Sequence, residues 1–328
     1  MNSEKIEILD SLRAFAALSV CLYHFVCTTT GYIQSDYILN LFYNGQFGVQ
    51  LFFVISGFII PWSMYNAGYQ LKDFFKFFIK RLARLEPPYI FSIILVLAIL
   101  FLREHFLGKS NDHVELSGAQ IFLHLGYLIP YFEKYEWLNP VYWTLAVEFQ
   151  YYLLIALLYI PLIKAPQLIR ILIYSLSFPL SYIGTDYFLC AWLPVFFLGI
   201  ILSLYKINLI KKNEFYIVTF LMLIFCLFRY EFGVVIFSFI AIIFILHWSD
   251  LKIIGLHFLG KFSYSIYLIH PILGASLVNM LSHKLVSDSG KIIAILSGIL
   301  FTIITSYINY LLVERPSKNM SASIKYKK

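Results

Sequence analysis

Ten separate runs of about 20 mostly apolar residues restrict the fold of this chain more than any other feature of its sequence. A run of that length crosses the hydrocarbon layer of a bilayer as one α-helix, which satisfies its own backbone polar groups. The composition agrees, because 60% of the residues are hydrophobic and only 13% are charged, against about a quarter in soluble domains. We therefore expect an all-α integral membrane protein with about ten transmembrane helices. The expected spans are residues 9–29, 47–64, 87–106, 142–163, 168–184, 187–205, 214–230, 232–248, 262–282 and 291–313.

Lysine and arginine are unevenly divided between the two sides that ten spans would create. The side of the N-terminus holds 19 of these residues and the opposite side holds 6, which together make up all 25 in the chain. Because basic segments stay in the cytoplasm, we expect both termini to be cytoplasmic. The net charge of +7 then reports topology and contact with anionic lipid, and no nucleic-acid partner is needed to explain it.

The first span contains three residues that are costly in hydrocarbon: Asp10, Arg13 and His24. At about 100° per residue, all three fall on one face of a helix, and Asp10 can pair with Arg13 at i, i+3. Arg13 and His24 are separated by about 16 Å along the helix axis, so their side chains cannot meet. His24 therefore needs a partner from another part of the chain.

The segment between the second and third spans carries five basic residues. Its lysines are typical of a juxtamembrane helix that touches anionic headgroups. Arg81 and Arg84 differ, because they are spaced i, i+3 at the mouth of a span, and planar guanidinium groups bind phosphate in a bidentate manner. We expect this pair to bind a phosphate or pyrophosphate group.

Glu148 is the second costly residue within a span, and it follows Trp143. A carboxylate at membrane depth costs on the order of 3 kcal/mol or more, and such residues usually face a cavity or a pathway. Glu148 has hydroxyl neighbours on its own helix, including Thr144 and Tyr152. A functional role is favoured over a purely structural pair with Arg13 or another base.

Two further groups of residues have both an ordinary and a functional interpretation. Ser56 and Gly57 form a small pair in an aromatic run, which is typical of close helix packing. Tyr267 and His270 share one face of the ninth span, just before Pro271, which frees a backbone carbonyl. For His270, a structural contact and a ligand-binding role are equally favoured.

The four cysteines all lie inside apolar runs, and no Cys-x-x-Cys or clustered Cys/His spacing occurs. This pattern argues against a disulfide framework and against a zinc site. We therefore expect no metal site.

Residues 107–141 form the longest expected segment outside the membrane, and they are rich in aromatic residues and carboxylates. An interfacial aromatic belt is the more ordinary interpretation. A sugar-binding platform is the alternative, because aromatic rings stack on the apolar faces of a sugar.

Six segments carry most of the informative residues: Leu9–Arg13 with His24, Gly48–Phe58, Arg81–Arg84, Trp143–Tyr152, Phe262–Pro271 and Glu314–Pro316. Together and in this order they resemble the acyltransferase 3 family of membrane acyltransferases, which includes bacterial O-antigen and exopolysaccharide O-acetylases. The sequence departs from the usual family pattern at Ser11, where glycine is usual, and at Pro87, which lies farther from the second arginine than usual.

The resemblance implies a bacterial inner-membrane enzyme that uses acyl-CoA, usually acetyl-CoA, as co-substrate, with no bound cofactor. It implies that the histidine of the first helix, His24, is essential and that the arginines take part in donor use. The expected partners are a carbohydrate or lipid-linked sugar acceptor, membrane lipid and, as an open alternative, a second copy of the chain. We expect residues 1–328 to form a single transmembrane domain without the hydrolase-like domain that some relatives carry.

These expectations combine into one hypothesis, in which acyl-CoA binds with its phosphates near Arg81, Arg84 and Arg13. The pantetheine arm then follows the first helix to His24, which acts as general base on an acceptor hydroxyl, while an acyl-histidine intermediate stays open. Glu148, the second catalytic candidate, would orient an imidazole or bind acceptor hydroxyls, and Ser56 would stabilise the oxyanion. The supporting residues expected around this site are Asp10, Ser56, Gly57, Trp143, Tyr267 and His270.

The competing class is a transporter or exporter of a polysaccharide or acyl group, in which Arg13, His24 and Glu148 form a proton relay. Inverted repeats would favour this class. We find none in the sequence, and the two halves of the chain differ in motif content.

Overall fold

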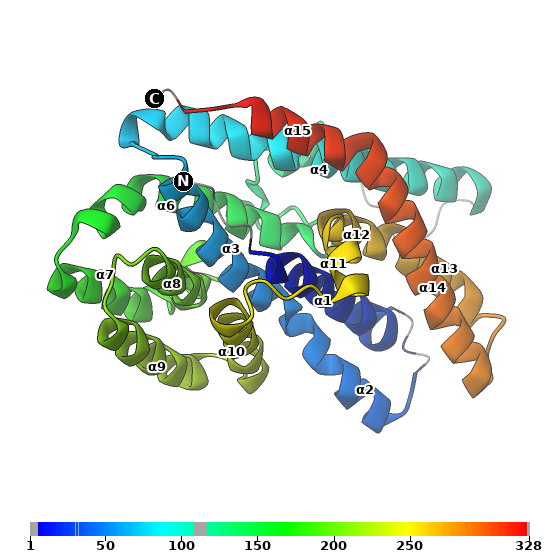
Figure 1. Cartoon of the computed structure of the whole chain (residues 1–328). Coiled ribbons are helices and arrows are strands. Elements are labelled where there is room, and N and C mark those ends of the chain that lie inside the picture. Colours follow the sequence, from blue (N-terminus) through cyan, green and yellow to red (C-terminus); the bar gives the residue numbers. More distant parts are fainter. Residues whose placement is uncertain (1–5, 30, 32, 108–116, 327–328) are drawn as a thin grey trace.

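The computed structural model of the chain describes residues 6–29, 31, 33–107 and 117–326, and this part of the chain is helical without any strand (Figure 1). The α-helices are α1 (Ile8–Tyr23), α2 (Asp36–Tyr43), α3 (Gly48–Asn66), α4 (Phe74–Leu107), α5 (Gly118–Leu125), α6 (Tyr142–Lys164), α7 (Gln167–Leu180), α8 (Leu189–Lys206), α9 (Lys212–Arg229), α10 (Phe232–His247), α11 (Ile254–Gly260), α12 (Ser263–Ile269), α13 (Ala275–Ser282), α14 (Asp288–Asn309) and α15 (Arg315–Ser323).

Seven helical segments in the described part of the chain are long and apolar enough to cross a membrane. The expectation of an integral membrane protein built of helices is therefore confirmed. Each of the ten expected spans coincides with a helical segment, but α7 and α10 are shorter apolar helices, and the 18 residues of α9 include three charged ones. The count of ten is thus not confirmed, and the cytoplasmic position of the termini stays a prediction. The seven segments are Ile8–Thr28, Asp36–Asn66, Leu71–Phe106, Tyr142–Lys164, Leu189–Lys206, Ser263–Ser282 and Asp288–Ser323.

The most extensive helix contact in the molecule joins α3 and α8, whose backbones touch at a pair of glycines. A Cβ atom added to Gly57 would lie within 2.2 Å of the carbonyl oxygen of Phe196, and one added to Gly199 would lie within 2.2 Å of the carbonyl oxygen of Val54. Small residues permit such close approach of helices in membranes. Gly57 therefore packs two helices together, as the ordinary interpretation of the Ser56–Gly57 pair predicts.

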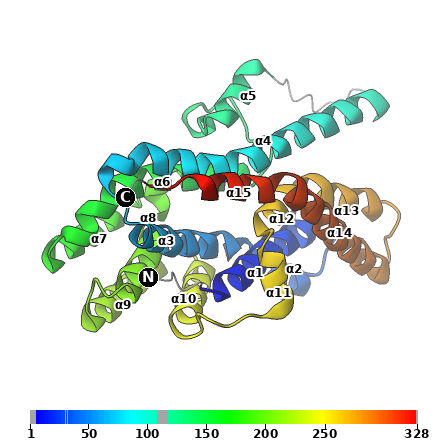
Figure 2. The same ribbon diagram turned by 45° about the horizontal axis from the view of Figure 1, so that its top comes forward.

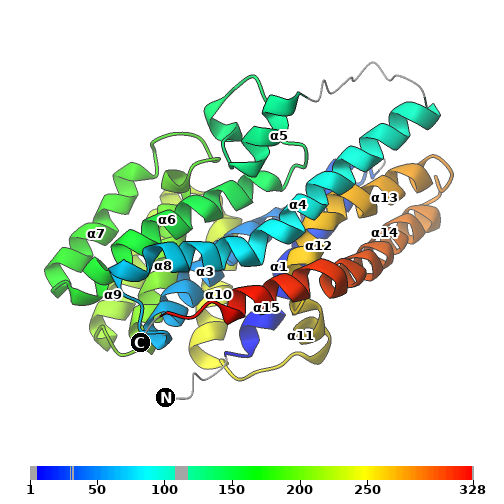
Figure 3. The same ribbon diagram turned by 90° about the horizontal axis from the view of Figure 1, so that it is seen from above.

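The helix α4 continues through Pro87 and Pro88, so the basic segment ahead of the third span is the first half of one long helix. The tyrosine hydroxyl of Tyr264 donates a hydrogen bond to the carbonyl oxygen of Leu85, just ahead of the prolines. The last helix, α15, lies beside this first half of α4 (Figure 3), and Ser321 donates a hydrogen bond to the carbonyl oxygen of Lys80. The basic residues of α4 are therefore held against the protein and not only against lipid.

Three short π-helical turns interrupt the α-helices, at His24–Thr28, His270–Gly274 and Tyr310–Glu314. Turns of this kind are rare and frequently occur at functional sites. Two of them begin at a histidine. In the first, the hydroxyls of Thr28 and Thr29 donate to the carbonyl oxygen of His24. The local helix geometry is thus altered where both histidines lie.

The segment 117–141 contains α5 and a short turn, and α5 lies at the edge of the molecule, on the far side of α4 from α1 (Figures 2 and 3). Its aromatic side chains are divided, because Phe122, Tyr131 and Phe132 are exposed whereas Tyr127 is buried. The ring of Tyr127 stacks against those of Tyr89 and Phe149, and its hydroxyl donates a hydrogen bond to Glu86. Residues 108–116 of the expected loop lie outside the described residues.

Candidate active site

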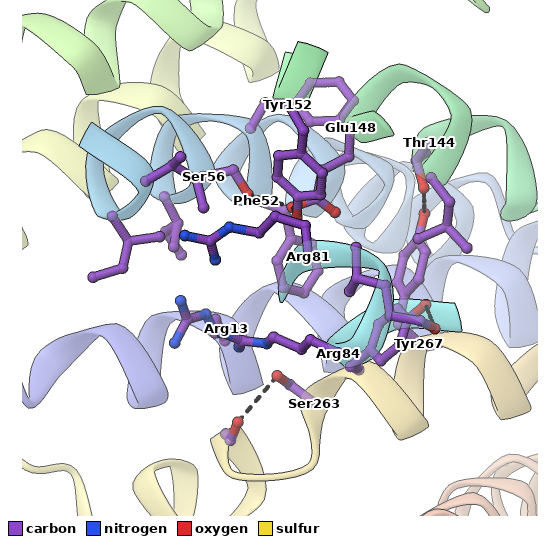
Figure 4. A pocket seen from close by; sticks show the side chains of 18 of the residues that line it. Arg13, Phe52, Ser56, Arg81, Arg84, Thr144, Glu148, Tyr152, Ser263 and Tyr267 are labelled. Atoms are coloured by element: carbon purple, nitrogen blue, oxygen red, sulfur yellow. Dashed lines mark hydrogen bonds between the residues drawn. The ribbon is translucent and has the colours of Figure 1, made fainter. Parts of the chain in front are cut away.

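A cavity of about 160 Å³ lies among several helices, and the side chains of Arg13, Arg81 and Arg84 point into it (Figure 4). It is lined by α1, α3, α4, α6, α11, α12, α15 and the π-helical turn Tyr310–Glu314. We call it the cationic cavity. The arginines come from α1 and α4, while α3, α6 and α12 contribute hydroxyl groups and aromatic rings. Three guanidinium groups around one small space attract an anionic ligand.

Arg81 is the most deeply placed of these arginines, with 7% of its surface exposed. Its Nη2 donates a hydrogen bond of 3.1 Å to the hydroxyl of Ser63, and its guanidinium lies over the rings of Phe77 and Tyr152. Its Nε is buried without a hydrogen-bond partner, and neither Arg81 nor Arg84 pairs with a carboxylate among the described residues. A buried cation with an unused donor is suited to bind an anion.

Arg13 and Lys318, by contrast, already have carboxylate partners in the same cavity. Arg13 Nη1 lies 3.5 Å from Asp10 Oδ1, as the i, i+3 spacing predicts. Lys318 Nζ lies 2.7 Å from Glu314 Oε1, and the other oxygen of Glu314 accepts from the backbone N–H and the hydroxyl of Ser265. The cationic character of the cavity therefore rests mainly on Arg81 and Arg84.

Glu148 lines the cationic cavity and is bonded by two hydroxyl groups. Its Oε1 accepts hydrogen bonds from Ser56 at 2.8 Å and from Tyr152 at 2.6 Å. The Ser56 hydroxyl proton is thus directed at Glu148. The side chain that pairs with the imidazole of His24 is that of His270, whereas Glu148 lines the cationic cavity.

A second cavity, of about 680 Å³, contains His24. We call it the aromatic cavity, because its walls include Trp143, Tyr187, Trp192 and Tyr230. The ring of Trp143 contacts those of Tyr187 and Trp192, so these walls form a connected aromatic surface. Such a surface is suited to the apolar faces of a sugar, and its charged and hydroxyl-bearing rim is suited to sugar hydroxyls.

Val49 and Tyr267 line both cavities and form the wall between them. The hydroxyl of Tyr267 lies 2.9 Å from Thr144 Oγ1, and its ring contacts that of Phe52 edge to face. The two spaces therefore meet at Val49 and Tyr267.

His24 and His270 contact each other across the interface of the first helix with α12. His24 Nδ1 lies 3.1 Å from His270 Nε2 and 2.9 Å from the carbonyl oxygen of Val20. His270 is completely buried, and its Nδ1 lies 3.1 Å from the carbonyl oxygen of Ile266. The long-range partner that His24 requires is therefore His270.

The residues singled out in the sequence are brought together in two groups. Arg13 and His24 belong to one helix, yet they line different cavities, because the wall at Tyr267 divides the space along that helix. Gly57 touches neither cavity, and His270 lies behind His24. Asp10, Arg13, Ser56, Arg81, Arg84, Glu148 and Tyr267 line the cationic cavity, and His24, Trp143 and Tyr267 line the aromatic cavity.

Several lining residues were missed by the sequence analysis. Tyr264 lies within the segment Phe262–Pro271, and Lys318 lies two residues after Glu314–Pro316, so nearness to these segments was an available signal. Tyr187 and Trp192 lie where a loop enters α8, and only the fold brings them to His24.

One group of possible metal ligands, Glu7, Asp10 and His257, occurs in the described part of the chain. Lys252 Nζ lies 3.5 Å from Glu7, and Arg13 pairs with Asp10. This group is accounted for as an ion-pair network, and the expectation of no metal site stays a prediction.

Comparison with known proteins identifies relatives for part of this architecture. The chain is 30% identical over 156 residues to the O-acetyltransferase OatA of Staphylococcus aureus, which covers 45% of the chain and 24% of that protein. It is 34% identical over 156 residues to the putative peptidoglycan O-acetyltransferase YrhL of Bacillus subtilis, covering 44% and 22%. It is 27% identical over 185 residues to the peptidoglycan O-acetyltransferase OatA of Listeria monocytogenes, covering 52% and 27%.

The chain thus matches about a quarter of the length of these relatives. No solved structure matches it. The family described as "Acyltransferase domain" matches residues 6–311, which is nearly the whole chain and includes the lining of both cavities except Glu314 and Lys318. The chain therefore belongs to the acyltransferase 3 family of membrane acyltransferases.

Proposed function

We propose that the chain transfers an acyl group, most simply acetyl, from acyl-CoA to a hydroxyl group of a carbohydrate in the bacterial inner membrane. The observation that carries the proposal is the pair of cavities that meet at Tyr267, with the arginines on one side and His24 on the other. An anionic donor needs a cationic environment, and a sugar acceptor needs an aromatic one. The family supports acyl transfer and does not favour the alternative of a transporter.

In this proposal, the donor enters by the cationic cavity from the cytoplasm. The phosphates of CoA bind Arg81 and Arg84, whose guanidinium groups have no carboxylate partner among the described residues. A cavity of about 160 Å³ is too small for a whole CoA, so the adenosine part stays outside, and the pyrophosphate and the acyl-pantetheine arm pass the arginines. The thioester then reaches the wall at Tyr267.

The acceptor enters by the aromatic cavity, where rings stack against the sugar. Two of the similar proteins are named for peptidoglycan, so a cell-wall glycan is the first acceptor to test, ahead of lipopolysaccharide and other surface polysaccharides. The imidazole of His24 lies in this cavity and takes the proton of the attacking hydroxyl.

The transfer is balanced without any further reactant. The hydroxyl oxygen attacks the thioester carbonyl, a C–O ester bond forms and the C–S bond breaks. The proton held by His24 passes to the sulfur, and CoA leaves as the free thiol. An acyl-histidine intermediate would divide the same exchange into two steps. Glu148 holds Ser56 and Tyr152 in place and offsets the charge of the arginines.

The test uses purified protein in vesicles, with labelled acetyl-CoA on the donor side and peptidoglycan oligosaccharides as acceptor. We expect labelled ester on the glycan, and at least about a hundredfold loss in His24→Ala, as for removal of a general base. His283→Ala, an exposed histidine that lines neither cavity, is the matched control. Normal product from a folded His24→Ala protein would refute the assignment, and uptake of label without ester formation would favour a transporter.

A further inference from the structure

We propose that His270 is a positioning residue that holds the neutral imidazole of His24 with its proton on Nδ1, so that Nε2 is the free base. The proposal rests on the proposed function and names the atom that performs the proton transfer. It depends on which atoms surround the imidazole rings of His24 and His270.

The proton of His270 is located by its backbone partner. Its Nδ1 lies 3.1 Å from the carbonyl oxygen of Ile266, and a carbonyl oxygen can only accept a hydrogen bond. Nδ1 therefore carries the proton. No carboxylate pairs with His270 among the described residues, and a charged ring that is completely buried would lack a counter-ion. The neutral ring thus presents the lone pair of Nε2 toward His24.

The same reasoning locates the proton of His24. Its Nδ1 lies 2.9 Å from the carbonyl oxygen of Val20 and 3.1 Å from Nε2 of His270. Both neighbours are acceptors, so the Nδ1–H of His24 is shared between them in a three-centre hydrogen bond. The remaining lone pair of the ring is on Nε2, for which no described residue supplies a hydrogen bond. Because the ring lines the aromatic cavity, this lone pair is available to an acceptor hydroxyl.

Packing around Gly274 and Phe25 fixes the distance between the two histidines. Both residues belong to the π-helical turns that begin at His24 and His270. A Cβ atom at Gly274 would lie 2.1 Å from Thr302 Oγ1 and 2.4 Å from the ring of Phe25, so the two turns touch directly. The rings are held by backbone that is itself tightly packed.

Two substitutions distinguish a positioning role of His270 from a role in filling space. His270→Gln keeps a polar group at the place of Nε2, whose amide oxygen accepts from His24, whereas His270→Leu fills the space without an acceptor. We expect His270→Leu to lower kcat about fivefold to tenfold, as for loss of one hydrogen bond, with an unchanged KM for acetyl-CoA. His270→Gln restores most of kcat. A role in packing alone would affect the two variants in proportion to their stability.

The direct readout is the ¹⁵N spectrum of histidine-labelled protein in lipid nanodiscs, with the His24 signals assigned by comparison with His24→Gln. We expect a protonated Nδ1 and an unprotonated Nε2 in the wild-type protein, and a mixture of tautomers in His270→Leu. His124 is an internal reference, because its Nδ1 lies 2.8 Å from the carbonyl oxygen of Gln120 and its Nε2 accepts from Leu138 N–H. Its signals should not change in the His270 variants.

A wild-type His24 protonated on Nε2, or a His270→Leu protein with wild-type kcat and an unchanged His24 spectrum, would overturn the proposal. Failure of the proposed function can be distinguished from failure of this proposal. Acetyl transfer by a His24→Gln protein would refute the general-base role of His24, while the ¹⁵N spectrum of the wild-type protein would still test the tautomer.

Discussion

The hydroxyl of Tyr267 lies 2.9 Å from Thr144 Oγ1, in the wall that the cationic and aromatic cavities share. This bond holds the tyrosine ring between a space suited to an anionic donor and a larger space suited to a sugar. In the proposed function, this wall would separate the donor thioester from the water of the aromatic cavity.

Removing the ring should therefore uncouple donor cleavage from transfer. In Tyr267→Ala we expect the release of free acetate from acetyl-CoA to rise as glycan acetylation falls, because water reaches the thioester. Tyr267→Phe keeps the ring and loses only the bond to Thr144, so its ratio of hydrolysis to transfer should stay close to that of the wild type. The measurement is labelled acetate against labelled glycan, and an unchanged ratio in Tyr267→Ala would contradict the role of the wall.

The arginines of α4 should determine the affinity for the donor. Arg81→Lys and Arg84→Lys keep the positive charge but lose bidentate bonding, and we expect each to weaken acetyl-CoA binding by about tenfold or more, as for a lost charge-assisted hydrogen bond. Arg103→Lys, an exposed arginine of the same helix, is the matched control. Calorimetric titration with acetyl-CoA gives the affinity. Equal binding by all three variants would leave Arg81 and Arg84 as structural residues.

Glu148 should affect stability through its acceptor oxygen and donor binding through its charge. Glu148→Ala leaves the hydroxyls of Ser56 and Tyr152 without their partner, and we expect it to lower stability by about 1–3 kcal/mol. Glu148→Gln keeps a carbonyl acceptor but removes a negative charge from the cavity, so it should be more stable than the alanine variant and bind the anionic donor more tightly. Thermal unfolding and acetyl-CoA titration check the two effects, and weaker donor binding by Glu148→Gln would contradict the second.

His124, which lies outside the membrane-spanning segments, should make stability depend on pH. Burial lowers the pKa of His124 below its ordinary value of about 6.5, and both ring nitrogens are used by backbone groups in the neutral form. Because the unfolded chain binds the proton more readily, the contribution is complete above about pH 6.5 and is lost as the pH falls through the folded pKa.

We therefore expect the melting temperature to fall between about pH 7 and 5, and the fall to be smaller in His124→Gln, which lacks the titrating ring. His283→Gln, with the same change at an exposed position, should retain the wild-type slope. Parallel curves for the wild type and His124→Gln would show that other groups carry the acid sensitivity.

Much of the helical architecture was predictable from the sequence, because length and apolar composition are local properties of a run. Each expected span coincides with a helical segment, and the pairing of Asp10 with Arg13 follows from a spacing of three residues. The continuation of α4 through Pro87 and Pro88 was not predictable, since packing against α15 and the tyrosine of α12 overrides the local preference of proline.

For the candidate site, the sequence by itself determined which side chains are too costly to face lipid: Arg13, His24, Glu148 and the arginines of α4. It could not show that Arg13 and His24 line different cavities, or that His24 meets His270 and not Glu148. Those relationships join residues from helices far apart in the chain. The tertiary structure decided them, because close contacts such as Gly57 with α8 and Gly274 with Phe25 set how the helices cross and which polar groups then meet.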